Sequence, residues 1–198
     1  MSGRPGDWHP LTEDGRDPFP GDWELVQEAA ARYRRTADSI RTARELLREV
    51  TDSRDGWQSD AGEAFREQAT EVSDDVWQAY GRYDAAADAL AYYWPHLQDV
   101  QEESLELRRR AQQAQEELDR LGPRVEAAED EDAGTHDQLA GLQGQVESVQ
   151  SELNRLRDRL AQLIEDKDVA AQRAADAIGE FIGGDGLTDG FWDRMGAA

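Results

Sequence analysis

Two long heptad seams, separated by a short polar segment, most constrain how this chain can fold. In both seams small or apolar residues alternate steps of three and four, from Leu97 to Val125 and from Leu139 to Leu163. That repeat is typical of coiled-coil helices. Because the segment between the seams is short, we expect an antiparallel coiled-coil hairpin over residues 95–178, with its tip near residue 132; pairing between molecules is the alternative. The principal seam residues are Leu97, Val100, Leu107, Leu118, Leu121, Leu142, Val146, Leu153 and Leu160.

Residues 22–94 carry the patterns of two further helices. Asp22 can cap the first, over about residues 23–51, and apolar residues recur along one face of each helix. In the second helix, from about residue 59, that face includes Phe65, Val72 and Tyr83. We expect the two to pack antiparallel. The predicted fold is therefore all-α: an elongated helical hairpin extended by the antiparallel coiled-coil hairpin.

Two prolines predict breaks in this pattern. A proline inside a helix costs about 3 kcal/mol and usually kinks or ends it. Pro95 separates the second helix from the first seam, so we expect a kink or a new helix there. Gly122-Pro123 falls within the last turn of the first seam and predicts an early end to its helix.

The two ends of the chain differ from its middle in composition. Residues 1–21 contain four of the six prolines and four glycines, which predicts an extended arm without regular structure. Within this arm Trp8, Leu11 and Phe19 are spaced to dock on a surface. At the other end, repeated glycines predict a linker over residues 179–198.

A turn joins the two helices of the expected hairpin. Asp55-Gly56 is a turn dipeptide, and Asp60 followed by Glu63 has the order of a capping box. A Trp-x-Gly elbow followed by small residues and a phenylalanine marks the WXG-type proteins of type VII secretion. This chain resembles them at Trp57, Ser59 and Phe65, with serine in place of the usual glycine. A turn tryptophan in an ordinary helical bundle is the alternative reading.

Longer stretches extend the resemblance. Trp8-His9-Pro10-Leu11 with residues 17–22 resembles the lead-in of the type VII secretion-signal domain at the head of actinobacterial polymorphic toxins, and residues 185–193 resemble the stretch that leads from such domains into a toxin. The resemblance implies a WXG-like hairpin and export without a cleavable signal peptide, from the cytoplasm to the outside. It also implies recognition by the secretion machinery or a small helical chaperone, and a payload beyond the linker.

An export signal is implied within the second helix. Proteins of the WXG type commonly carry Tyr-x-x-x-Asp or Glu, and Tyr80 and Asp84 match this pattern. Residues four apart share one face of a helix, so ring and carboxylate would be presented together. Because Tyr80 also lies on the expected core stripe, a purely packing role is the alternative.

Composition argues against several other functions. The net charge is −22, with 44 acidic and 22 basic residues, whereas nucleic acids and anionic membranes are bound by clustered Lys and Arg. No segment approaches the roughly 18 apolar residues of a membrane span. Cysteine is absent, and neither a zinc-protease pair, a phosphate loop nor a nucleophile elbow occurs. We therefore expect no enzymatic activity, no metal and no cofactor.

Two functional hypotheses follow. The first is a non-enzymatic export module at the N-terminal end of a polymorphic toxin secreted by a type VII system. The second is a cytosolic scaffold that forms a homo-oligomer through its seams, from Leu97 to Leu163. An oligomeric state abolished by Leu153→Asp would favour the scaffold.

Overall fold

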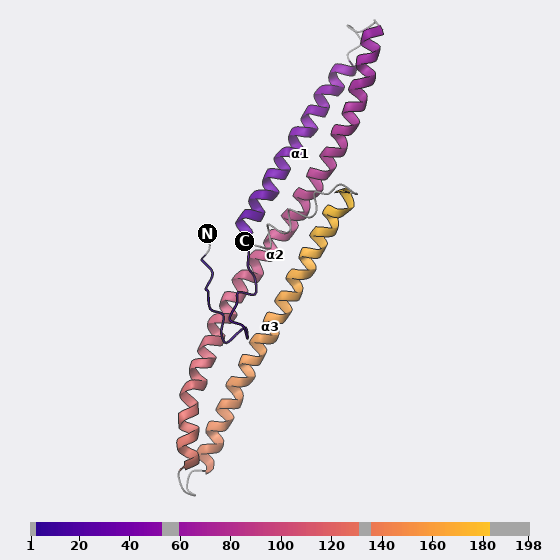
Figure 1. Cartoon of the computed structure of the whole chain (residues 1–198). Helices are drawn as coiled ribbons and strands as arrows, with labels where there is room; N and C mark the ends of the chain where they lie inside the picture. Colours follow the sequence, from indigo (N-terminus) through magenta and orange to yellow (C-terminus); the bar gives the residue numbers. More distant parts are fainter. Residues whose placement is uncertain (1–2, 53–59, 131–135, 183–198) are drawn as a thin grey trace. The chain divides into compact units, whose positions relative to one another are not determined.

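The computed structural model describes residues 3–52, 60–130 and 136–182, which form three helices and no strands (Figure 1). The helices are α1 (Trp23–Asp52), α2 (Asp60–Asp130) and α3 (His136–Ile182). The all-α prediction is confirmed for the described residues. They form two compact units: unit 1 contains residues 3–20 with 97–130 and 136–169, and unit 2 contains residues 21–52 with 60–96 and 170–182.

Helix α1 begins where the sequence predicts. The backbone amides of Glu24 and Leu25 donate to Oδ1 of Asp22, at 2.9 and 3.3 Å, which satisfies two of the amides that have no partner within the helix. The carboxylate of Glu24 in the first turn also interacts favourably with the helix dipole. The N-cap assigned to Asp22 is therefore confirmed.

In unit 2, α1 packs antiparallel against the first part of α2. The rings of Trp23 and Trp94 lie 5.9 Å apart, and those of Tyr33 and Tyr83 lie 5.7 Å apart, so the residue numbers rise along α1 while they fall along α2. The last turns of α3 join this pair. The core that α2 and α3 form there consists mostly of alanines, which allow close approach of the helices: Ala86, Ala89, Ala174 and Ile178, with Tyr33, Tyr93 and Ala177 packed against them.

In unit 1, α2 and α3 pair antiparallel along the seams. Arg159 forms a two-pronged ion pair with Glu103, at 2.6 and 2.9 Å, and Arg110 pairs with Glu152, one heptad further along α2 and one heptad back along α3. Both seams are buried within the chain, where Leu118 and Val146 are half-buried and the fully buried members are Leu97, Val100, Leu107, Leu121, Leu142, Leu153 and Leu160. The expected tip falls within residues 131–135, outside the described residues.

Helix α2 continues through both prolines, so the expected new helix at Pro95 and the expected early end at Pro123 are wrong. Packing on either side explains the continuity. Leu90 and Leu97 are buried on either side of Pro95, and Leu121 and Ala128 belong to a core cluster on either side of Pro123. Burial of large aliphatic side chains contributes about 1.5 to 3 kcal/mol each, enough to offset the cost of one proline.

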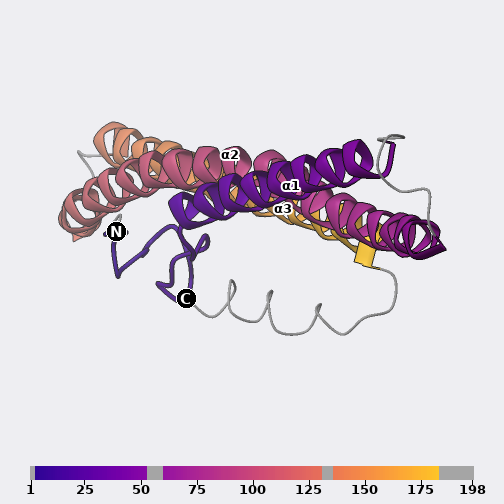
Figure 2. The ribbon, with the colours of Figure 1, turned by 90° about the horizontal axis from the view of Figure 1, so that it is seen from above.

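The arm before α1 contains no helix or strand, as predicted, and follows an irregular path (Figure 2). Its three apolar anchors are buried: Trp8 and Phe19 are 0% exposed and Leu11 is 3% exposed. The indole Nε1 of Trp8 donates to the carbonyl oxygen of Pro5 at 2.8 Å, so its one polar group is satisfied inside the arm. The prediction that these residues dock on a surface is confirmed.

Polar contacts tie the arm to α2. Arg4 forms a two-pronged ion pair with Asp17, at 2.5 and 2.8 Å, and its guanidinium also donates to the carbonyl oxygen of Gln101 and to Oγ of Ser104. The amide of Gln101 donates in turn to the carbonyl oxygen of Phe19 at 3.0 Å. Gln101 and Ser104 are 5% and 0% exposed. The arm therefore explains why two polar residues stand on a buried face of α2.

Candidate functional site

Of the three residues of the expected WXG-like elbow, the structure describes one. Trp57 and Ser59 lie outside the described residues. Phe65 lies near the start of α2 and is 40% exposed. The role of Phe65 in the elbow therefore stays a prediction.

The apolar face expected along the first part of α2 is only partly core. Val72 and Tyr83 are 50% and 37% exposed, whereas Gly62, Ala69 and Ser73 are buried. The expectation that Phe65, Val72 and Tyr83 lie in the core is thus wrong. Among the described helices α1 packs against this part of α2, and one neighbouring helix covers only one side of it.

Tyr80 lies in a stack of three side chains. Its ring packs on that of Trp77, with centroids 4.6 Å apart and planes 9° from parallel. The guanidinium of Arg44, from α1, lies 4.0 Å from the centre of the Trp77 ring, and its Nε donates to Oγ of Ser73 at 3.4 Å. Trp77 is 41% exposed and Tyr80 is half-buried. The stack therefore holds Tyr80 at the edge of the hairpin, where its side chain is only partly buried.

Asp84, one turn further along α2, is held by a charge from α1. Arg34 forms ion pairs with both Asp84 and Asp88. The side chain of Asp84 is 30% exposed and that of Asp88 is 71% exposed. Partial burial lowers the pKa of Arg34, but the hydrogen bond that Arg34 donates to Asp88 and the charges of Asp88, Asp84 and Asp38 outweigh it and raise that pKa. Arg34 therefore stays charged at any working pH.

Together these residues form one site, the Trp77 strip: Arg34, Arg44, Trp77, Tyr80 and Asp84. The three α2 residues follow one another in steps of three and four, which place them on one side of the helix. The sequence singled out Tyr80 and Asp84. Trp77 could have been found from its spacing to them, whereas the two arginines could not, because nothing in the sequence sets the register of α1 against α2.

The Trp77 strip is suited to binding rather than to reaction chemistry. Tyrosine, tryptophan and arginine are the residues that most often dominate the binding energy of protein interfaces. Aromatic rings fixed by stacking also lose little side-chain entropy when a partner binds. Nowhere in residues 3–52, 60–130 and 136–182 does a group of three or more His, Asp or Glu side chains come close enough to hold a metal ion.

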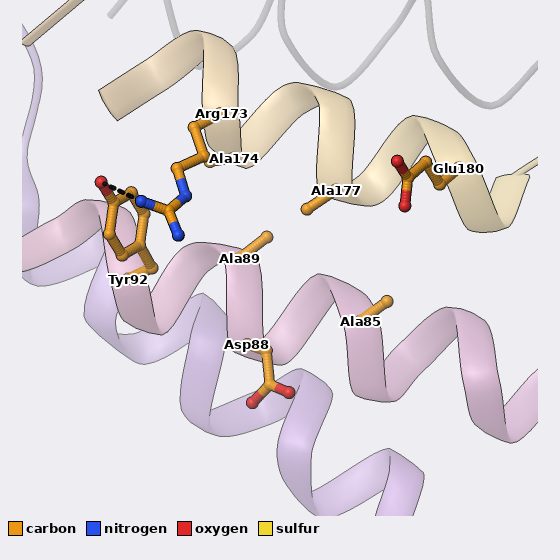
Figure 3. A pocket seen from close by; sticks show the side chains of 8 residues that line it. All are labelled: Ala85, Asp88, Ala89, Tyr92, Arg173, Ala174, Ala177 and Glu180. Carbon is orange, nitrogen blue, oxygen red and sulfur yellow. Dashed lines mark hydrogen bonds between the residues drawn. The ribbon is translucent and has the colours of Figure 1, made fainter. Parts of the chain in front are cut away.

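A shallow pocket of about 320 Å³ lies between α2 and the end of α3 in unit 2 (Figure 3). Half of its eight lining residues are alanines: Ala85, Ala89, Ala174 and Ala177. The guanidinium of Arg173 lies 4.7 Å from the centre of the Tyr92 ring, and its Nη1 donates to the Tyr92 hydroxyl at 3.5 Å. The polar groups of Arg173 and Tyr92 at the pocket therefore contact each other.

Comparison with protein-family models, with curated proteins and with solved structures finds no match to this chain. In the part of the chain that the structure describes, no helix is both long enough and apolar enough to cross a membrane. The function is therefore argued from the residues of the site.

Proposed function

We propose that this chain is a non-enzymatic export module, the N-terminal part of a polymorphic toxin secreted by a type VII system. The observation that carries the proposal is the joint presentation of Tyr80 and Asp84 at the surface of unit 2. Tyr80 is stacked on Trp77, and Asp84 is held by Arg34. The partner is the secretion machinery or a small helical chaperone, and the protein is exported from the cytoplasm to the outside.

Preorganisation is what makes this arrangement suitable for recognition. A ring and a carboxylate on a free helix would each lose rotamer entropy on binding, at about 0.5 to 1.5 kcal/mol per side chain. In the Trp77 strip that cost is already met by the stack and by the ion pair to α1. Because the strip contains residues of both α1 and α2, a partner would recognise it only when the hairpin is folded.

The burial of the seams leaves the scaffold hypothesis without support of its own. Leu153 is 6% exposed and Leu160 is 5% exposed, both within the chain's own coiled coil. Self-association through these residues would require α3 to leave α2. We therefore retain the export module alone.

Secretion is the direct test. The tagged chain is expressed in an actinobacterium with a type VII system and in the same strain without the motor ATPase, and supernatant is compared with cytosol. We expect export that disappears without the motor. Folded protein retained in the cytosol of both strains would contradict the proposal.

The role of the Trp77 strip is tested with two matched aspartates. Asp84→Asn and Asp88→Asn each remove one carboxylate from Arg34, but only Asp84 belongs to the Tyr-x-x-x-Asp pattern. We expect Asp84→Asn to reduce export and Asp88→Asn to leave it unchanged, with similar melting temperatures for both. Equal export from the two variants would show that Asp84 serves packing only.

A further inference from the structure

The arm before α1 is closed by hydrogen bonds of its own. Gly15 has a φ of 67°, a conformation that favours glycine, and its carbonyl oxygen accepts a hydrogen bond from the amide of Trp8 at 3.0 Å. The amides of Leu11 and Thr12 donate to the carbonyl oxygen of Trp8, at 2.9 and 3.1 Å. Oγ1 of Thr12 donates to the carbonyl oxygen of Arg16 at 3.2 Å. The loop is thus bonded to itself, and its residues can move as one unit.

Two of the bonds that hold the arm on the coiled coil lie at the surface. Nε of Arg108, from α2, donates to the carbonyl oxygen of Asp7 at 2.6 Å, and Nη2 of Arg157, from α3, donates to that of Pro10 at 2.9 Å. Both bonds are exposed to solvent. Because water can replace either partner, these two bonds should add little to the closed state.

Arg4 is the buried link between the arm and α2. Its side chain is 9% exposed, and within the arm it pairs with Asp17. The same guanidinium donates to the carbonyl oxygen of Gln101 at 2.9 Å and to Oγ of Ser104 at 3.0 Å. A charge taken out of water is costly unless it is paired and hydrogen-bonded, so the seat of Arg4 on α2 matters more than the two exposed bonds.

The surface under the arm is polar where a permanent core would be apolar. Gln101 and Ser104 are 5% and 0% exposed, whereas Leu97 and Leu107, on either side of them in α2, continue the apolar seam. Replacing a buried hydrogen-bonded pair by apolar groups of the same shape can be neutral or stabilising. Water, however, can satisfy an amide and a hydroxyl once the arm has left. The two polar residues therefore lower the cost of exposing this part of α2.

A hinge lies at the end of the arm. The chain passes from unit 1 to unit 2 between Pro20 and Gly21, and Gly21 has a φ of 116°. Glycine adopts positive and negative φ about equally readily, so the chain can change direction there. Asp22, the next residue, caps α1 with its own side chain. The start of α1 therefore does not require the arm.

We propose that residues 3–20 form a strap that opens about Gly21 while α2 and α3 stay paired, with Arg4 as its latch. Opening uncovers Gln101 and Ser104 to solvent and releases the arm from unit 1. The proposal concerns unit 1, whereas the Trp77 strip belongs to unit 2, so it holds whether or not the chain is exported.

Thiol labelling of the full chain measures the opening. The sequence contains no cysteine, so one introduced thiol reports on one position. Ser104→Cys places a thiol of similar shape under the arm, and Ala128→Cys places one in the core cluster of α2 and α3, at a residue that is 6% exposed. When closing is faster than reaction with an aromatic disulfide reagent, the labelling rate is proportional to the open fraction.

Two arginines of the arm provide the comparison. Arg4→Ala removes the latch, whereas Arg16→Ala removes an equal charge whose side chain is 86% exposed. We expect Arg4→Ala to speed the labelling of Ser104→Cys at least about tenfold and that of Ala128→Cys less than about twofold. Arg16→Ala should change either rate less than about twofold, and circular dichroism should show the same helix content throughout.

Three results would overturn the proposal. An equal increase at Ser104→Cys and Ala128→Cys would mean that the arm leaves only when α2 and α3 separate. Equal effects of Arg4→Ala and Arg16→Ala would mean that Arg4 is not the latch. Loss of helix content in Arg4→Ala would make the arm a required part of the coiled coil rather than a strap on it.

Discussion

Trp8 anchors the arm to the coiled coil although the arm contains no regular secondary structure. It is 0% exposed, its Nε1 has an acceptor at 2.8 Å, and the guanidinium of Arg4 lies 4.8 Å from the centre of its ring. Trp77, in the regular helix α2, is by contrast 41% exposed. Secondary structure is therefore a poor guide to which tryptophan stabilises this protein.

We predict that Trp8→Ala lowers the free energy of unfolding by about 3 to 5 kcal/mol, the usual cost of truncating a fully buried large aromatic residue. Trp77→Ala, the matched control, should cost about 1 to 2 kcal/mol, since it removes one exposed stack and one cation–π contact. Urea titration followed by circular dichroism measures both. Equal losses from the two variants would mean that the arm adds little to stability.

At the scale of single residues, the sequence predicts which side chains of the arm are buried better than it predicts which residues of α2 they contact. Trp8, Leu11 and Phe19 were predicted to dock because large apolar residues stand among prolines and glycines. That Gln101 and Ser104 receive the arm could not be predicted, because both are ordinary polar residues of a helix. Their burial depends on the contacts of Arg4 and Phe19, about a hundred residues away in sequence.

At the scale of elements, α2 shows where local rules fail. The start of α1 and the heptad seams were predictable because caps and apolar spacing are local signals that agree with the tertiary packing. The expected new helix at Pro95 and the expected early end at Pro123 were wrong because the cost of a proline is also local, whereas the burial that offsets it at Pro123 involves α3. Ala91 and Asp119, whose carbonyls lose their helical donors, both occupy exposed positions of α2 where water can replace them.

Pro123 is consequently a position at which a substitution should make the protein more stable. We predict that Pro123→Ala raises the free energy of unfolding by about 2 kcal/mol, because the helical cost of about 3 is relieved while up to about 1 is lost through a more flexible unfolded chain. Glu126→Ala, at a nearby exposed position, serves as the control and should gain only a few tenths. An unchanged urea midpoint for Pro123→Ala would show that the helix already accommodates proline without cost.

At the scale of the whole molecule, charge opposes stability. The chain carries a net charge of −22, and the ion pairs between its helices, such as Arg110 with Glu152, are partly exposed to solvent. Exposed pairs contribute about 0 to 1 kcal/mol each. Self-repulsion among the excess carboxylates involves many more pairs of charges, so it should dominate the response to salt.

We predict that the melting temperature rises when NaCl increases from about 10 to about 150 mM, because the screening length falls from about 30 to about 8 Å. KCl at equal concentration should have the same effect, since screening depends on ionic strength. A melting temperature that falls with both salts would mean that pairs such as Arg34 with Asp84 outweigh the repulsion.

The contacts that hold the arm also determine when folding of the chain can be completed during synthesis. Arg157 of α3 donates to the carbonyl oxygen of Pro10, a partner 147 residues earlier in the chain. At about 5 to 20 residues per second, the ribosome needs roughly 7 to 30 s between these two residues. Throughout that interval the contact between the arm and α3 cannot form. The arm can therefore meet Gln101 and Ser104 of α2 first, and its contact with α3 forms only after Arg157 has been made.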